Sequence, residues 1–155
     1  MKKLLIFLIL FAILFISSGQ TYEEQSLIPA LEKYLSTKPF ETLLSFIHIP
    51  YWGTTVSIEE RGYYAFIEFL LRKAAHFFIF AAIALAIVNL LPKLGAKLAF
   101  AITVAIALFD EYHQSLTGGR TPTAEDVLLD AFGAAVALGI WKLWILKKFN
   151  KKKLE

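Results

Sequence analysis

The sequence predicts an all-α integral membrane bundle of four transmembrane helices, with both termini in the cytoplasm and a helical segment outside the membrane between helices one and two. Three observations predict this fold class. Of 155 residues, 57% are hydrophobic and only 19% are charged, whereas a soluble domain is about half apolar and about a quarter charged. Four long apolar stretches divide the chain. If these stretches cross the membrane in alternating directions, most of the lysines fall on one side of it, which predicts the orientation.

The predicted spans cover about residues 3–19, 70–91, 95–113 and 124–146, and the outer segment covers 20–69. Residues 1–155 therefore form a single domain. Crossing about 30 Å of hydrocarbon takes roughly 20 helical residues, so the first and third spans are short. The first span has a second interpretation as a cleavable signal peptide, because Lys2 and Lys3 precede 13 apolar residues and Ser17-Ser18-Gly19 follows them.

The charge distribution predicts the orientation. If the N-terminus is cytoplasmic, that side carries ten cations and one acid, a net charge of +9. The outer side then carries six cations and twelve acids, a net charge of −6. The positive-inside rule therefore predicts that both termini are cytoplasmic. This asymmetry also argues against nucleic-acid binding, and the absence of cysteine excludes disulfides and thiol chemistry.

The outer segment contains helix signals. Apolar residues between Leu27 and Leu35 recur at helical spacing, and a second short helix is predicted over about 39–47. Residues 50–53 are interpreted as a turn with interfacial aromatic rings. Ser57-Ile58-Glu59-Glu60 matches a capping box, from which we expect one unbroken helix over about 58–91.

Polar residues gather at one membrane depth, at the outer ends of the second, third and fourth spans. Ionisable groups at such a depth usually face the bundle interior and often mark a site. The predicted ligand-binding residues are Arg72, Lys73, His76, Asp110, Glu111, Gln114, Arg120, Asp126 and Asp130.

Each of these residues also has a structural interpretation. Lys73 and Arg72 suit interfacial anchors, and Asp126 suits the first turn of a helix capped by Thr121 or Thr123. Asp130 is the hardest to explain in this way, because a carboxylate inside an apolar stretch needs a partner or a proton.

Binding of an anion explains more of this set than catalysis does. The cations would hold a phosphate or carboxylate, as in an outer-leaflet lipid headgroup or a cell-wall precursor. The alternative is a membrane enzyme acting on lipid or cell-wall intermediates, with His76, Glu111 or His113 as catalytic candidates and a carboxylate, with or without a metal, as partner. A third interpretation makes the cluster structural. We favour the non-enzymatic binding protein, and with no standard ligand motif present we predict no cofactor and no metal ion.

Several short motifs resemble the VanZ-like family of bacterial membrane proteins. They are Arg72-Lys73-Ala74-Ala75-His76-Phe77, Asp110-Glu111-Tyr112-His113-Gln114, Gly119-Arg120, and Asp126 with Gly133 seven residues later. The family pattern is roughly R-K-x-x-H-F, D-E-x-x-Q, G-R and D-x-x-x-N-x-x-G. The chain departs from it at Asp130, where the pattern has asparagine, and at Phe80, where tyrosine is frequent.

The resemblance implies a multi-pass protein of the bacterial cytoplasmic membrane with its polar cluster on the extracytoplasmic side. It favours a retained first span over a signal peptide. Some relatives lower susceptibility to the glycopeptide teicoplanin, so an effect on that susceptibility is an expectation here as well. The bilayer is the expected partner, and the sequence does not define an oligomeric state.

Overall fold

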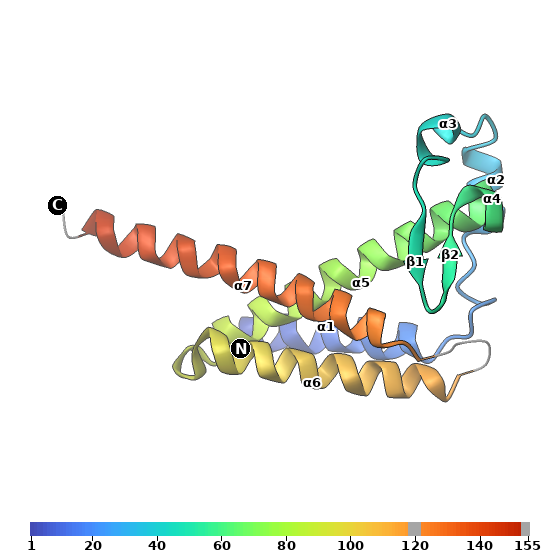
Figure 1. The fold of residues 1–155 in the computed structure, drawn as a ribbon. Helices are drawn as coiled ribbons and strands as arrows, with labels where there is room; N and C mark the ends of the chain where they lie inside the picture. Colours follow the sequence, from blue (N-terminus) through green and yellow to red (C-terminus); the bar gives the residue numbers. More distant parts are fainter. Residues whose placement is uncertain (118–121, 153–155) are drawn as a thin grey trace.

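The computed structural model describes residues 1–117 and 122–152 and is mostly helical (Figure 1). Its elements follow in the order α1 (Lys2–Ser18), α2 (Ile28–Tyr34), α3 (Glu41–Leu44), β1 (Ile49–Tyr51), β2 (Thr54–Val56), α4 (Ile58–Arg61), α5 (Tyr63–Leu90), the 3-10 helix η1 (Pro92–Leu94), α6 (Gly95–Ser115) and α7 (Ala124–Lys152).

Within the described residues, three segments are long and apolar enough to cross a membrane: Tyr63–Leu90, Pro92–Ser115 and Ala124–Lys148. They correspond to the second, third and fourth predicted spans. The first predicted span is the helix α1, which has 17 residues. Many large apolar side chains of these helices are exposed, among them Leu5, Phe78, Leu128 and Leu143. An apolar outer surface on long helices is what a lipid environment requires.

The helices alternate in direction (Figure 1). At one end of the bundle, Lys3 Nζ donates a hydrogen bond to the carbonyl of Asn89, which joins the start of α1 to the end of α5. At the other end, Ser18 at the end of α1 is hydrogen-bonded to Asp110 near the end of α6. Buried side chains from all four helices form the core, in particular Leu14, Phe80, Ile83, Ile87, Val88, Ala99, Ala107, Ala134 and Leu138.

The helices α5 and α7 cross in close contact, and Gly133 permits this approach. A Cβ atom at residue 133 would lie 2.4 Å from the carbonyl oxygen of Phe77, inside any normal contact distance. Small residues let helix backbones approach closely in membranes. Gly139 on the same helix differs, because no heavy atom lies within 4 Å of its Cβ position.

The outer segment contains a β-hairpin that the all-α prediction missed. The strands β1 and β2 pair antiparallel from Ile49 opposite Val56 to Tyr51 opposite Thr54. The predicted turn is present between them, with Trp52 and Gly53 both at positive φ (49° and 69°). Two such residues form the tight connection that suits the twist of a hairpin. Strands of three residues are too short for alternation to reveal them.

The prediction of one unbroken helix over 58–91 was wrong. Ser57 caps a helix as predicted, and its Oγ accepts a hydrogen bond from the Glu60 amide at 3.2 Å. The helix ends after one turn, because Gly62 takes φ 80° and ψ 160°, and α5 then begins at Tyr63. The second short helix is also shorter than predicted, since α3 covers only Glu41–Leu44.

The hairpin and the helices α2, α3 and α4 lie together at the end of the bundle where α5 and α7 begin (Figure 1). A second apolar cluster of Val56, Phe66 and Phe69 fixes the hairpin onto the start of α5. This arrangement covers the helix ends that carry the polar motifs.

Candidate functional site

A cavity of about 490 Å³ lies between the outer segment and the polar ends of the helices. Its size is typical of small-molecule sites, which range over about 300–1,000 Å³. The side chains that line it come from the start of the outer segment, the hairpin and α4, and from the end of α1, the first half of α5, the end of α6 and the start of α7. They include Ser17, Tyr22, Gln25, Tyr51, Trp52, Arg61, Phe69, Arg72, Lys73, His76, Gln114, Thr123 and Asp126.

Arg72 is held in place by a carboxylate that the sequence analysis did not single out. Glu68 lies one turn earlier on α5 and is fully buried. Its Oε1 accepts hydrogen bonds from Arg72 Nη2 at 2.8 Å and from the Leu27 amide at 2.8 Å. The Arg72 guanidinium also donates to Gln25 Oε1 at 3.0 Å and lies over the Tyr22 ring at 4.4 Å. The outer segment is therefore fastened to α5 through this arginine.

Lys73 joins α5 to α7 and to the hairpin. Its ammonium group forms an ion pair with Asp126 and donates a hydrogen bond to the Tyr51 hydroxyl at 2.7 Å. It also lies 4.5 Å from the centre of the Tyr51 ring. Burial raises the pKa of Tyr51 above its ordinary value, and its hydrogen bond with Asp126 raises it further. The phenol therefore stays neutral and keeps its proton.

The cavity has an excess of cationic side chains. Arg61, Arg72 and Lys73 line it, and Asp126 is the one carboxylate among the described lining residues. Buried Glu68 adds a second carboxylate next to Arg72, so cations still outnumber carboxylates. Arg61 stacks over the Phe69 ring at 5.5 Å and has no carboxylate partner among the described residues. Lysine has three ammonium hydrogens, and the described bonds of Lys73 use two of them. Donors therefore remain for an incoming anion.

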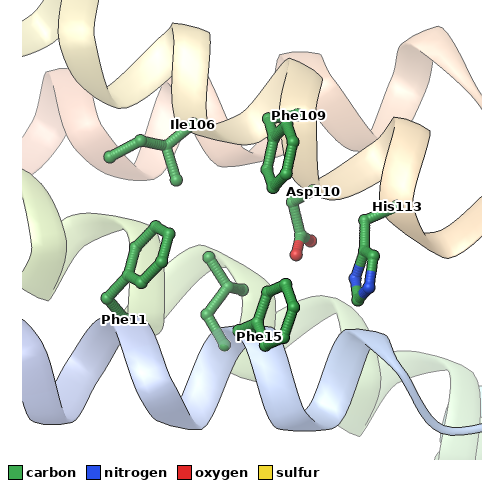
Figure 2. A pocket seen from close by; sticks show the side chains of 7 residues that line it. Phe11, Phe15, Ile106, Phe109, Asp110 and His113 are labelled. Atoms are coloured by element: carbon green, nitrogen blue, oxygen red, sulfur yellow. The ribbon is translucent and has the colours of Figure 1, made fainter.

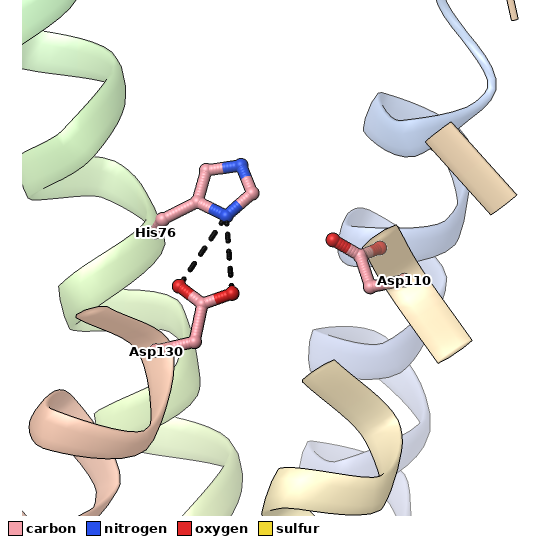
Figure 3. Close-up of side chains that lie close together, drawn as sticks. All are labelled: His76, Asp110 and Asp130. Carbon is pink, nitrogen blue, oxygen red and sulfur yellow. Dashed lines mark hydrogen bonds and ion pairs between the residues drawn. The ribbon is translucent and has the colours of Figure 1, made fainter. Parts of the chain in front are cut away.

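His76 lines the cavity, and two buried aspartates lie behind it. Figure 3 shows His76 on α5, Asp130 on α7 and Asp110 on α6 directed toward one another. Nδ1 of His76 lies 3.4 Å from Asp130 Oδ1 and 3.5 Å from Oδ2. Asp130 is 2% exposed and Asp110 is 4% exposed. One suitable atom of each residue lies within 4.8 Å of the others.

Asp110 is the centre of a buried hydrogen-bond network. Ser18 Oγ donates to its Oδ1, and Gln114 Nε2 donates to its Oδ2 at 2.6 Å. Gln114 lies one turn later on α6, so its amide and the Asp110 carboxylate share a helix face. The end of α1 is thereby joined to α6.

Two of the catalytic candidates do not line the cavity. Glu111 accepts a hydrogen bond from the Thr123 amide, so it ties α6 to the start of α7. His113 points toward α1, where it stacks on Phe15 at 4.5 Å (Figure 2). The hollow beside His113 measures about 10 Å³, which is roughly the volume that one water needs.

The structure brings together most of the predicted site residues. Arg72, Lys73, His76, Gln114 and Asp126 line the cavity, and Asp110 and Asp130 lie behind it. Thr123, one of the two predicted caps, accepts a hydrogen bond from the Asp126 amide at 3.2 Å. Arg120 lies outside the described residues.

Sequence reasoning missed several contributors to the site, among them Tyr51, Arg61, Glu68 and, as a cavity residue, Gln25. Only Glu68 carried a usable signal, since an acid four residues before Arg72 predicts a pair on one helix face. Tyr51 and Arg61 enter the site through the hairpin and the helix break, neither of which was predicted.

Searches of curated proteins and of solved structures produced no match. The sequence matches the VanZ/LLP1 family over residues 3–146, which includes every polar side chain described above. This chain belongs to the VanZ/LLP1 family of membrane proteins.

Proposed function

We propose that this protein binds the anionic headgroup of an outer-leaflet lipid or of a lipid-linked cell-wall precursor in the cavity beneath the hairpin. The observation that carries the proposal is the composition of that cavity. Three cationic side chains and one carboxylate line about 490 Å³. Arginine and lysine together suit a phosphate, since arginine donates in a planar fork and lysine acts as a point charge.

The cations are positioned before any ligand arrives. Buried Glu68 and Gln25 fix the Arg72 guanidinium, and Asp126 with Tyr51 fixes the Lys73 ammonium. Side chains that are already ordered lose less conformational entropy on binding, which favours affinity.

Aromatic side chains make the cavity suitable for an amphiphilic ligand. Tyr51, Trp52 and Phe69 line it together with the cations, and Trp52 is 52% exposed. Tryptophan and tyrosine prefer the membrane interface, where one part of the ring is apolar and the other is wet. A lipid that offers a phosphate and a glycerol or sugar fits such a lining better than a free inorganic ion.

The proposed location is the bacterial cytoplasmic membrane, with four spans, both termini inside and the cavity outside. The support is the charge asymmetry of +9 on the side of the termini against −6 on the side of the hairpin. The outer segment lies at the end of the bundle where α5 and α7 begin (Figure 1), and the residues that line the cavity come from the same end.

Native mass spectrometry of the purified protein tests the binding. Phosphatidylglycerol and phosphatidylcholine with identical acyl chains differ in headgroup charge, and we expect the anionic lipid to be retained preferentially. Lys73→Ala should lose this preference. The matched control is Lys33→Ala, which removes an exposed lysine of α2 outside the cavity. Equal retention of both lipids by the wild-type protein would refute the proposal.

An effect on teicoplanin susceptibility is a separate expectation, drawn from the family. It is tested by surface binding of labelled teicoplanin, with susceptibility, in a Gram-positive host without its own homologues. Arg72→Ala, Gln114→Ala and Asp126→Asn are compared with wild type at equal membrane abundance. Lower antibiotic binding with wild type than with these variants would support a resistance role, and equal binding would exclude it for this protein.

The alternative function is a membrane enzyme acting on lipid or cell-wall intermediates, and one observation favours it. His76 lines the cavity with Asp130 directly behind it, which is how a carboxylate orients a histidine general base. The enzyme predicts a changed lipid product that depends on His76 but not on His113. Retention of chemically unchanged lipid by the wild-type protein would count against it.

A further inference from the structure

His76, Asp110 and Asp130 come from three different helices and meet behind the cavity (Figure 3). One imidazole nitrogen and two carboxylate oxygens lie within 4.8 Å of one another. In a tetrahedral zinc site with bonds of about 2.0–2.2 Å, donor atoms are roughly 3.4 Å apart. Side-chain movements of about 1 Å would therefore bring these donors into coordination, without a change in the helices.

We propose that these three side chains form a binding site for one divalent transition-metal ion, with zinc as the ion that suits them best. Imidazole favours zinc over calcium and magnesium, and carboxylates complete the donor set. Three protein ligands leave at least one position open for water or another ligand. The site lies behind the anion-binding cavity and does not depend on it.

Asp130 supplies an independent reason for an ion at this place. It is 2% exposed, and its Oδ1 has no hydrogen-bond partner among the described residues. Oδ1 lies 3.4 Å from His76 Nδ1, so both oxygens face the imidazole and the space shared with Asp110. A buried carboxylate oxygen without a donor costs free energy, which a cation would recover.

The neighbouring cations already pair with other carboxylates. Lys73 pairs with Asp126, and Arg72 pairs with Glu68. Among the described residues, two buried carboxylates within 4.8 Å therefore have only the imidazole of His76 to offset their charge. A divalent ion would neutralise both, whereas a proton on His76 would neutralise one.

The surroundings of Asp110 have the form of an outer coordination shell. Ser18 and Gln114 donate to its two oxygens and fix the orientation of the carboxylate. Hydrogen bonds of this kind hold metal ligands in place, and losing one typically lowers metal affinity by about 10–100-fold. The end of α1 would thus contribute to the site through Ser18.

Zinc binding to the purified protein in detergent, prepared without a histidine tag and stripped with chelator, tests the proposal. Competition against a chromophoric chelator gives the affinity, and elemental analysis gives the stoichiometry. We expect about one ion per chain. His76→Gln and Asp130→Asn should each weaken binding by at least about 100-fold, and Ser18→Ala by about 10-fold. His113→Gln is the matched control and should bind as wild type does.

Asp130→Asn keeps the size of the side chain, so it tests charge and coordination with little change in packing. Zinc should also raise the unfolding temperature of the wild-type protein but not of this variant. The proposal is overturned if stripped wild-type protein takes up no zinc. It is equally overturned if Asp130→Asn and His76→Gln bind zinc as tightly as His113→Gln does. Neither result bears on lipid retention, so the two proposals fail separately.

Discussion

Replacing Gly133 by alanine tests the packing that holds the site together. The new Cβ would lie 2.4 Å from the Phe77 carbonyl oxygen, whereas ordinary contacts begin at 3.4 Å, so α7 must move away from α5 by about 1 Å. Overpacking of this kind costs about 1–3 kcal/mol. Alanine also stabilises a helix by about 1 kcal/mol relative to glycine, which partly hides this cost.

Gly139→Ala measures the gain in helix propensity by itself, because the alanine Cβ at this position of the same helix would meet no neighbouring atom within 4 Å. Subtracting the two effects removes the helix-propensity contribution and leaves about 1–3 kcal/mol. This corresponds to roughly a 5- to 150-fold difference in the unfolding equilibrium, since about 1.4 kcal/mol is a factor of ten. Reversible unfolding in mixed micelles with increasing dodecyl sulfate measures it. Equal stability of the two variants would refute the close approach of α5 and α7.

Three further outcomes are expected. Glu68→Gln should destabilise the protein by about 1.5–3 kcal/mol in the same assay, because the buried carboxylate accepts from the Arg72 guanidinium; an unchanged midpoint would contradict this pairing. Ser57→Ala should cost about 0.5–2 kcal/mol through loss of the cap on α4, and no loss would mean that the cap is dispensable. Because the chain has no cysteine, single cysteines report topology: Lys33→Cys should react with an impermeant maleimide on intact cells and Lys148→Cys only after permeabilisation, and the opposite pattern would reverse the orientation.

The long helices were predictable because their signals are local and strong. Apolar runs bounded by Pro92 and by polar motifs fix the end of α5, both ends of α6 and the start of α7 to within a few residues. Four-residue spacing placed Asp110 and Gln114 on one helix face, and the structure joins them. The number of spans and their orientation stay predictions, since α1 has only 17 residues.

The outer segment was less predictable, for physical reasons. A capping box marks where a helix starts but not where it stops, and Gly62 ends this one by adopting a positive φ. The hairpin depends on a two-residue turn and on burial of Val56 against α5, which is a tertiary effect. Arg61 and Tyr51 reach the cavity only through these two features.

The separate roles of the polar residues also required the structure. A single cluster was predicted, but the helices divide it into a cavity lined by cations and a buried group of His76, Asp110 and Asp130. Sequence spacing cannot distinguish His76, which faces the cavity, from His113, which stacks on Phe15. That difference depends on how α6 is rotated against α1.

The central claim is that the cavity beneath the hairpin holds an anionic headgroup. A crystal structure of the protein grown in a lipid phase doped with phosphatidylglycerol tests it most directly. The account predicts a phosphate within about 4 Å of the Lys73 ammonium or of the Arg61 guanidinium, with the acyl chains leaving past Trp52. A cavity that contains only water, with the phosphate of every bound lipid elsewhere on the surface, would contradict it.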